Sequence, residues 1–478
     1  MGTVDNADHR CRVRGGGGDE LEDTESHGFA DAHIQAYAKI FVAENDESHC
    51  CDRAQGSDKA MKDKSIISMR QLTILTALFI IGSAILIIPS NLAEEAKQDA
   101  WLSALVSLGL GLLVIPIYSA LCRRYPNQSL AEYCESILGK ILGKTVALCF
   151  IIGFALTTAA LTLRDIGDFI TMQIMPETPI EAIHIFFMLV IIFGASLGVE
   201  VFARGAEVFF PWVLLLFICF VLFVVPQIEV KQLLPVLERG MIPVLRGGLT
   251  FFSFPFLDLA VFLLILPSVK RKDKVTSALL WGCIIGGTFL MITTLLSILV
   301  IGADNTARHM YPSYALAKKI SLGNFLERLE AVMAVIWFLT TYFRLVLLLY
   351  ASAIGLAHSL RLSEHRFLIF PLGMIVVAWS ILFIPNTAYL DKLLDHWATY
   401  AVLPGLVFPI ILLVADSYRS NSKQPNDNLS LNDDGSQQAS GAADASNSSL
   451  LGGAGVIPMD DDPTSVLPSS GQTTPPER

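Results

Sequence analysis

Residues 246–267 read RGGLTFFSFPFLDLAVFLLILP, an apolar stretch of helix length with Pro255 close to its middle. A proline lacks the N–H that a helix needs and clashes with the preceding turn, so we expect the helix to break there. The apolar stretch 71–90 has a similar character, with Gly82-Ser83-Ala84 inside it and Pro89 near its end. Both stretches are therefore predicted to be interrupted helices.

The whole chain is too apolar for an ordinary soluble domain. Of its 478 residues, 53% are hydrophobic and only 16% are charged, whereas about 25% are charged in typical soluble proteins. A hydrocarbon core about 30 Å thick requires about 20 apolar residues in a helix, because backbone groups there must bond within the segment. We predict an all-α integral membrane protein with ten transmembrane helices, at residues 71–90, 100–121, 145–169, 182–200, 207–226, 246–267, 275–302, 331–357, 366–385 and 397–415.

Polar segments flank these spans on both sides. Residues 1–68 are expected to form a cytoplasmic tail, or to include an over-extended reading frame before Met61. Residues 419–478 are rich in Ser, Asn, Asp and Gly and are predicted to be disordered, which leaves 69–418 as the ten-helix membrane domain. Lys and Arg are more numerous in the short loops on the side of the tails, so the positive-inside rule places both termini in the cytoplasm.

The two interrupted helices occupy the first and sixth of the ten predicted positions. Non-helical backbone at membrane depth survives only where it faces protein or a water-filled cavity. Breaks at equivalent positions of two five-helix halves therefore indicate a binding site between them, and the freed amides can hold a carboxylate. The alternative is that glycines such as Gly82 serve only close helix packing.

A series of short motifs resembles the B-subunit permeases of spore germinant receptors. The resemblance covers about residues 65–418 and is carried by Ile67-Ser68 and Arg70-Gln71 through Gly82-Ser83 to Pro89, by Ala100-Trp101, by Tyr125-Pro126 with Leu130, by Ile137-Leu138-Gly139, by Pro235-Val236-Leu237, by Phe252 to Pro255, and by Tyr350-Ala351-Ser352 with Gly355-Leu356-Ala357. It implies the amino acid-polyamine-cation transporter fold, an inverted five-plus-five repeat with helices one and six broken. It also implies location in the inner membrane of the spore, assembly with an A subunit and a lipoprotein C subunit, and sensing of a nutrient germinant.

Arg344 stands near the middle of the eighth predicted span. A charge at the bilayer centre costs about 2.5–3.5 kcal/mol on insertion scales, so Arg344 is expected to face the bundle interior. It either supplies a fixed positive charge beside the broken first helix or pairs with backbone carbonyls for packing alone. Thr158, Thr162 and Asp165 share one face of the third span, and Arg164 with Asp168 is expected to form an interfacial ion pair.

We predict that a small germinant, such as an amino acid, binds between the broken spans. Its carboxylate is expected on main-chain amides, and the candidate ligand-binding residues are Gly82, Ser83, Thr158, Phe252, Ser253, Phe254, Thr340 and Thr341, with Arg344 as the charge in the membrane. Two alternatives remain, an amino acid transporter and a ligand-gated channel for ions or water.

Several function classes are not expected from this sequence. The histidines and eight cysteines have no metal-ligand spacing, and neither a nucleophile motif nor a phosphate-binding glycine loop is found. We therefore predict no enzyme activity, no cofactor, no metal and no nucleic-acid partner, and the lipid bilayer as the surroundings.

Overall fold

The computed structural model describes residues 67–126, 128–319 and 329–422, and every named element in these ranges is a helix. The predicted tails lie outside the described residues, apart from their edges at 67–68 and 419–422. The helices up to residue 233 are α3 (Met69–Ala84), α4 (Ile88–Ala96), η1 (Lys97–Asp99), α5 (Ala100–Arg124), α6 (Leu130–Leu138), α7 (Lys140–Cys149), η2 (Phe150–Leu156), α8 (Thr157–Gln173), α9 (Ile180–Ser196), α10 (Val199–Val224), η3 (Val225–Gln227) and η4 (Val230–Leu233).

The second set of helices begins after the loop that follows η4. It comprises α11 (Met241–Ser253), η5 (Leu257–Leu264), η6 (Leu266–Ser268), η7 (Lys272–Lys274), α12 (Val275–Ile301), α13 (Ala303–Arg308), α14 (Pro312–Lys319), α15 (Leu329–Leu360), α16 (Arg366–Leu382), α17 (Thr387–Val402), η9 (Leu403–Val407) and α18 (Phe408–Ser422). Most are α-helices, while η5 is a 3₁₀-helix and η2 and η9 are π-helices.

Among the described residues, seven helical segments are long and apolar enough to cross a membrane, at 88–124, 140–173, 199–227, 241–264, 272–301, 329–360 and 396–419. Three shorter apolar helices lie at 69–82, 180–196 and 366–382. The chain is therefore an all-α, multi-pass membrane protein. The predicted spans 71–90 and 246–267 are each divided into two helices, α3 with α4 and α11 with η5.

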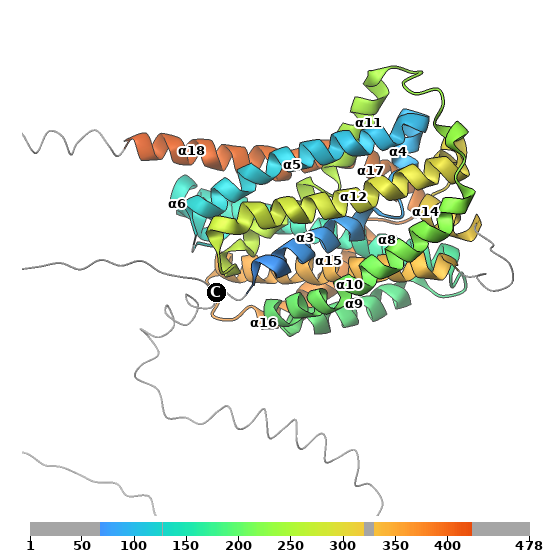
Figure 1. Cartoon of the computed structure of the whole chain (residues 1–478). Helices are drawn as coiled ribbons and strands as arrows, with labels where there is room; N and C mark the ends of the chain where they lie inside the picture. The colour runs from blue at the N-terminus through green and yellow to red at the C-terminus, as the bar shows by residue number, and fades with distance from the viewer. Residues whose placement is uncertain (1–66, 127, 320–328, 423–478) are drawn as a thin grey trace, which may run out of the picture. The chain divides into compact units, whose positions relative to one another are not determined.

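Helix α3 lies in the centre of the bundle and packs against α12, α15 and α10 (Figure 1). Its start is fixed by a capping box, in which the Ser68 and Gln71 side chains each accept a hydrogen bond from the other residue's backbone N–H. Just before the cap, Ile67 donates to the Ser268 carbonyl at the end of η6 and accepts from the Lys270 N–H. These bonds tie the start of the first divided helix to the segment that follows the second.

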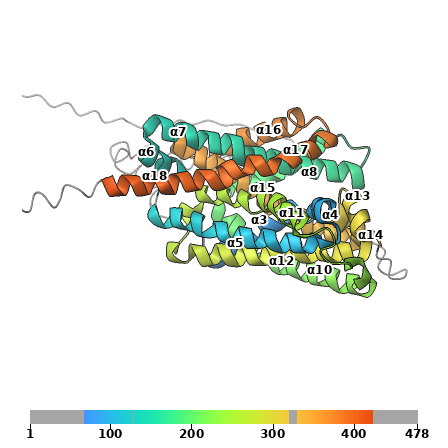
Figure 2. The same cartoon turned by 90° about the horizontal axis from the view of Figure 1, so that it is seen from above.

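Small residues allow α3 to approach its neighbours closely. A Cβ atom on Gly282 of α12 would lie 2.5 Å from the Thr76 side chain, and one on Gly286 would lie 2.8 Å from Ile80. Such close approach is the usual basis of helix packing in membranes. Around this centre, α11 packs on α5 and α4, and α18 lies alongside α5 and α6 (Figure 2).

Candidate functional site

Two helix breaks define the candidate site. Helix α3 ends at Ala84 and α4 begins at Ile88, after a turn at 85–87. Helix α11 ends at Ser253, and the 3₁₀-helix η5 begins three residues past Phe254 at Leu257, on the far side of Pro255. Helices α4 and α11 pack against each other, so the two breaks lie in neighbouring segments.

A small cavity opens beside both breaks. Its walls come from α4, α11 and α17, and it is lined by Ile87, Ile88, Asn91, Leu92, Gly247, Thr250, Phe251, Ser253, Phe254 and Trp397. The space is about 30 Å³, which holds water but not an amino acid. A ligand therefore requires side chains to move. The Trp397 indole N–H has no hydrogen-bond partner among the described residues and offers a donor at this wall.

Arg344 connects the centre of α15 to both divided helices. It is fully buried, and its Nη1 donates to the Phe79 carbonyl of α3 at 3.1 Å. Its Nη2 lies 2.5 Å from the Asp258 carboxylate of η5, and its Nε lies 3.4 Å from the Thr162 hydroxyl of α8. The guanidinium also lies over two aromatic rings, 4.3 Å from the Phe79 centroid and 5.8 Å from that of Phe254. The expectation that Arg344 faces the bundle interior is confirmed.

Asp258 is the partner that sequence reasoning missed. It is fully buried in the first turn of η5, three residues after Pro255. Only its Oδ2 is bonded, since Oδ1 has no hydrogen-bond partner among the described residues. A carboxylate inside the apolar run LDLAVFLLILP was the available signal, because the argument that singled out Arg344 applies to it equally.

The predicted ligand residues fall into two groups. Ser253 and Phe254 line the cavity, whereas the adjacent Phe252 is buried. Thr340 and Thr341 are fully buried on α15 against Gly82.

Gly82 serves close packing between α3 and α15. A Cβ atom there would lie 2.6 Å from the Thr340 carbonyl oxygen, and the Thr341 hydroxyl donates to the Gly82 carbonyl at 2.7 Å. Gly82 and Ser83 both belong to α3, so the break follows them instead of including them; the side chain of Ser83 lies outside the described residues. The first amides past the break are those near Ile88.

Two threonines of α8 stand beside this centre. Thr158 and Thr162 are buried, and each hydroxyl donates to the carbonyl four residues earlier in the chain. Thr162 also accepts from Arg344, so it contributes a polar contact to the ion pair. The Thr158 hydroxyl donates to the Phe154 carbonyl of the preceding helix η2.

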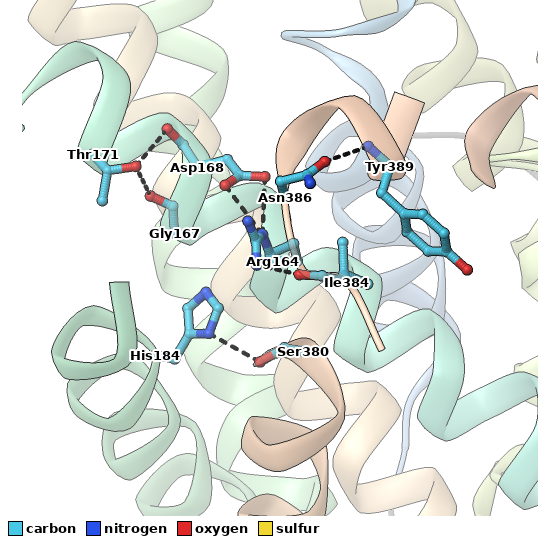
Figure 3. Close-up of polar contacts among 9 residues, drawn as sticks. All are labelled: Arg164, Gly167, Asp168, Thr171, His184, Ser380, Ile384, Asn386 and Tyr389. Atoms are coloured by element: carbon cyan, nitrogen blue, oxygen red, sulfur yellow. Dashed lines mark hydrogen bonds and ion pairs between the residues drawn. The ribbon is translucent and has the colours of Figure 1, made fainter. Parts of the chain in front are cut away.

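A second buried polar cluster lies further along α8 (Figure 3). The Arg164 Nε contacts both oxygens of Asp168 at 3.1 Å, and its Nη1 donates to the Ile384 carbonyl. The predicted ion pair between these two residues is confirmed, but both charged side chains are less than a tenth exposed, so the expectation that the pair reaches solvent was wrong. The loop after α16 supplies the Ile384 carbonyl that covers Arg164. Nearby, His184 Nδ1 lies 2.9 Å from the Ser380 hydroxyl.

Comparison with known proteins identifies the family. A family profile described as spore germination protein matches residues 66–388, more than half of the chain. The chain belongs to the spore germination protein family. Across the described part of this family member, no group of three or more His, Cys, Asp or Glu side chains is arranged to hold a metal ion.

Three relatives come from Bacillus subtilis (strain 168). Spore germination protein KB is 30% identical over 367 residues, which cover 76% of this chain and 97% of that protein. Spore germination protein YndE is 25% identical, with 75% and 99% covered. Spore germination protein A2 is 25% identical, with 70% and 92% covered. The family resemblance predicted from the motifs is confirmed.

Proposed function

We propose that this chain is the permease-like subunit of a spore nutrient germinant receptor, which binds a small germinant within the membrane and triggers germination. The cavity at the two helix breaks is the observation that carries this proposal. It is lined mainly by apolar side chains, with the polar groups of Asn91, Thr250, Ser253 and Trp397 at its walls. A few polar groups in an apolar pocket suit a small, neutral or zwitterionic nutrient such as an amino acid.

The proposed architecture has ten spans in two inverted halves. The first half takes α3 with α4, α5, α7 to α8, α9 and α10, and the second takes α11 with η5, α12, α15, α16 and α17 to α18. The divided helices then stand first in each half, which supports this assignment. The loop charges support cytoplasmic termini in the inner spore membrane. Membership of the family supports assembly with an A subunit and a lipoprotein C subunit.

Ligand binding at the breaks has a clear physical basis. Helix α4 begins at Ile88, so the positive end of its dipole lies beside Ile87 and Ile88 in the cavity wall. Pro89 has no N–H and the Ser90 N–H donates to the Ile87 carbonyl, so a charged head group needs donors beyond those of this helix end. Arg344 holds α3, α8, α15 and η5 together with no need for a bound cation. Receptor function, transport or both can follow from such a site, and no described feature requires enzyme chemistry.

Germination assays on spores separate a receptor from a transporter. Asn91→Ala and Trp397→Phe each remove a polar group of the cavity wall, and Leu113→Ala is the control because Leu113 is 71% exposed on α5. Release of spore-core solutes is measured against single amino acids and sugars, with receptor abundance checked by blotting. We expect both cavity variants, at normal abundance, to lose or shift the response to one nutrient.

The contrary result is equally clear. If germination by every nutrient is unchanged while uptake of a labelled amino acid by growing cells falls, the chain is an amino acid transporter and the receptor proposal is wrong. Conductance triggered by a nutrient that does not itself cross the membrane would instead favour a ligand-gated channel.

A further inference from the structure

Two buried ion pairs among the described residues, Arg164–Asp168 and Arg344–Asp258, differ in how their carboxylate oxygens are used. Both oxygens of Asp168 lie within hydrogen-bond distance of the Arg164 Nε, so neither is without a donor. In the central pair, Asp258 uses Oδ2 alone and its Oδ1 has no hydrogen-bond partner among the described residues. A buried carboxylate oxygen without a donor is costly, and a native protein rarely retains one without a reason.

Arg344 is the donor side of this pair. A guanidinium carries five N–H groups, and Arg344 donates to the Thr162 hydroxyl, the Phe79 carbonyl and the Asp258 carboxylate. The pair thus places a guanidinium with several donors beside a carboxylate oxygen that has no hydrogen-bond partner among the described residues, and a contact of 2.5 Å joins the two side chains.

Phe254 lies between this pair and the cavity. Its ring lines the cavity and also lies 5.8 Å from the Arg344 guanidinium carbon. It is the one residue in 251–260 that is partly exposed, while its neighbours there are buried. Since it occupies the break between α11 and η5, no regular helix constrains the backbone that carries it. Rotation of this ring would open a connection between the cavity and the pair.

We propose that Asp258 and Arg344 form the head-group subsite for a zwitterionic α-amino acid, covered by Phe254 in this conformation. The carboxylate of the ligand accepts from the Arg344 guanidinium, and its ammonium donates to Asp258 Oδ1. In an α-amino acid, the ammonium and the carboxylate are attached to the same carbon and lie close together. The two charged side chains of the pair are also adjacent, so each can meet the opposite charge of the ligand. Bidentate Arg–carboxylate contacts are among the strongest and most selective hydrogen bonds. The inference rests on the proposed germinant site and specifies its chemistry.

The subsite predicts which nutrients act. A ligand that lacks one of the two charges leaves a buried partner unpaired, and such a loss weakens binding severely. Spores carrying the full chain are tested with each standard L-α-amino acid and with glucose. For every amino acid that acts, its decarboxylated amine and its deaminated acid are also tested. We expect at least one amino acid to trigger germination, and neither of its analogues to do so.

Asp258→Asn is the diagnostic variant, and Asp168→Asn is its matched control. Both remove a charge from a buried ion pair, and the second lies in the cluster of Figure 3, away from the cavity wall. With abundance equalised by blotting, we expect Asp258→Asn to raise the half-maximal amino acid concentration by about tenfold or more. Asp168→Asn should leave it within about twofold. Asp258→Glu keeps the charge and should restore part of the response.

Phe254→Leu keeps the test decisive if Asp258→Asn does not accumulate. It leaves the ion pair intact and removes the covering ring, so we expect a lower half-maximal concentration for the same amino acid. An unchanged or higher value would overturn the covering role of Phe254.

Failure of this inference differs from failure of the proposed function. A response through this chain to glucose, or equally to an amine or acid analogue, overturns the zwitterion subsite and leaves the receptor standing. So does an Asp258→Asn variant of normal abundance with an unchanged response. If no nutrient response depends on the chain, the receptor proposal fails and the inference fails with it.

Discussion

The ion pair between Asp258 and Arg344 makes a quantitative prediction about stability that is separate from ligand binding. The perturbation is a cycle of three variants, Asp258→Leu, Arg344→Met and the double replacement. Leucine is close in shape to aspartate, and methionine follows the apolar stem of arginine. We expect each single variant to be far less stable than the parent and the double variant to be close to it.

The magnitudes follow from burial. Both side chains are 0% exposed, so removal of one leaves the other charge without water. In Asp258→Leu, the guanidinium loses its carboxylate contact at 2.5 Å and keeps hydrogen bonds to the Phe79 carbonyl and the Thr162 hydroxyl. Breaking a buried pair typically costs about 3–5 kcal/mol, whereas replacing both partners by apolar residues is often neutral. The double variant should lie within about 1 kcal/mol of the parent, which gives a coupling of several kcal/mol.

Unfolding of the purified full chain by titration with a denaturing detergent measures these free energies, with circular dichroism as the signal. Leu113→Ala serves as the control for a lipid-facing change, because that side chain is 71% exposed. If the loss in the double variant equals the sum of the two single losses, the charges do not compensate each other. That result would refute the reasoning.

Two further predictions concern packing. Gly167→Ala places a Cβ atom 2.1 Å from the His184 Nε2, which is too close for a real contact, so we expect the free energy of unfolding to fall by about 1–3 kcal/mol. Gly109→Ala is the control, because a Cβ atom there meets open space. In the same detergent titration it should be neutral or slightly stabilising. Tyr400→Phe removes the hydrogen bond from the Tyr400 hydroxyl to the Gly153 carbonyl in the π-helix η2. We expect a loss of about 1 kcal/mol in the same assay, and an unchanged value would show that the bond is not formed in the membrane protein.

The sequence was sufficient to predict divided helices but not where the first one divides. Pro255 falls inside the second break, since the lack of a donor and the ring clash act locally. Gly82 was an ambiguous signal, because a glycine in a membrane helix can serve a break or a close contact. In the structure Gly82 makes a close contact with the Thr340 carbonyl, and α3 continues for two residues beyond it. Whether a glycine marks a helix break or a close contact depends on the helix that faces it.

The charged residues show a similar division between local and tertiary information. Arg344 was correctly placed inside the bundle, because the energy of a charge in hydrocarbon leaves few alternatives. The pair Arg164–Asp168 was expected at the interface from its position near a helix end. It is buried because the chain after α16 crosses over it and supplies the Ile384 carbonyl. The position of a charged residue along its own helix does not reveal whether a segment from elsewhere in the chain covers it.

The central ion pair contacts the backbone close to both helix breaks. Asp258 lies in the first turn of η5, where the positive end of the helix dipole favours a carboxylate. That first turn exists only because α11 stops at Ser253. Arg344 reaches across to the Phe79 carbonyl, one turn before α3 ends. A ligand that altered either break would therefore move one end of a buried pair whose other end lies on the unbroken helix α15.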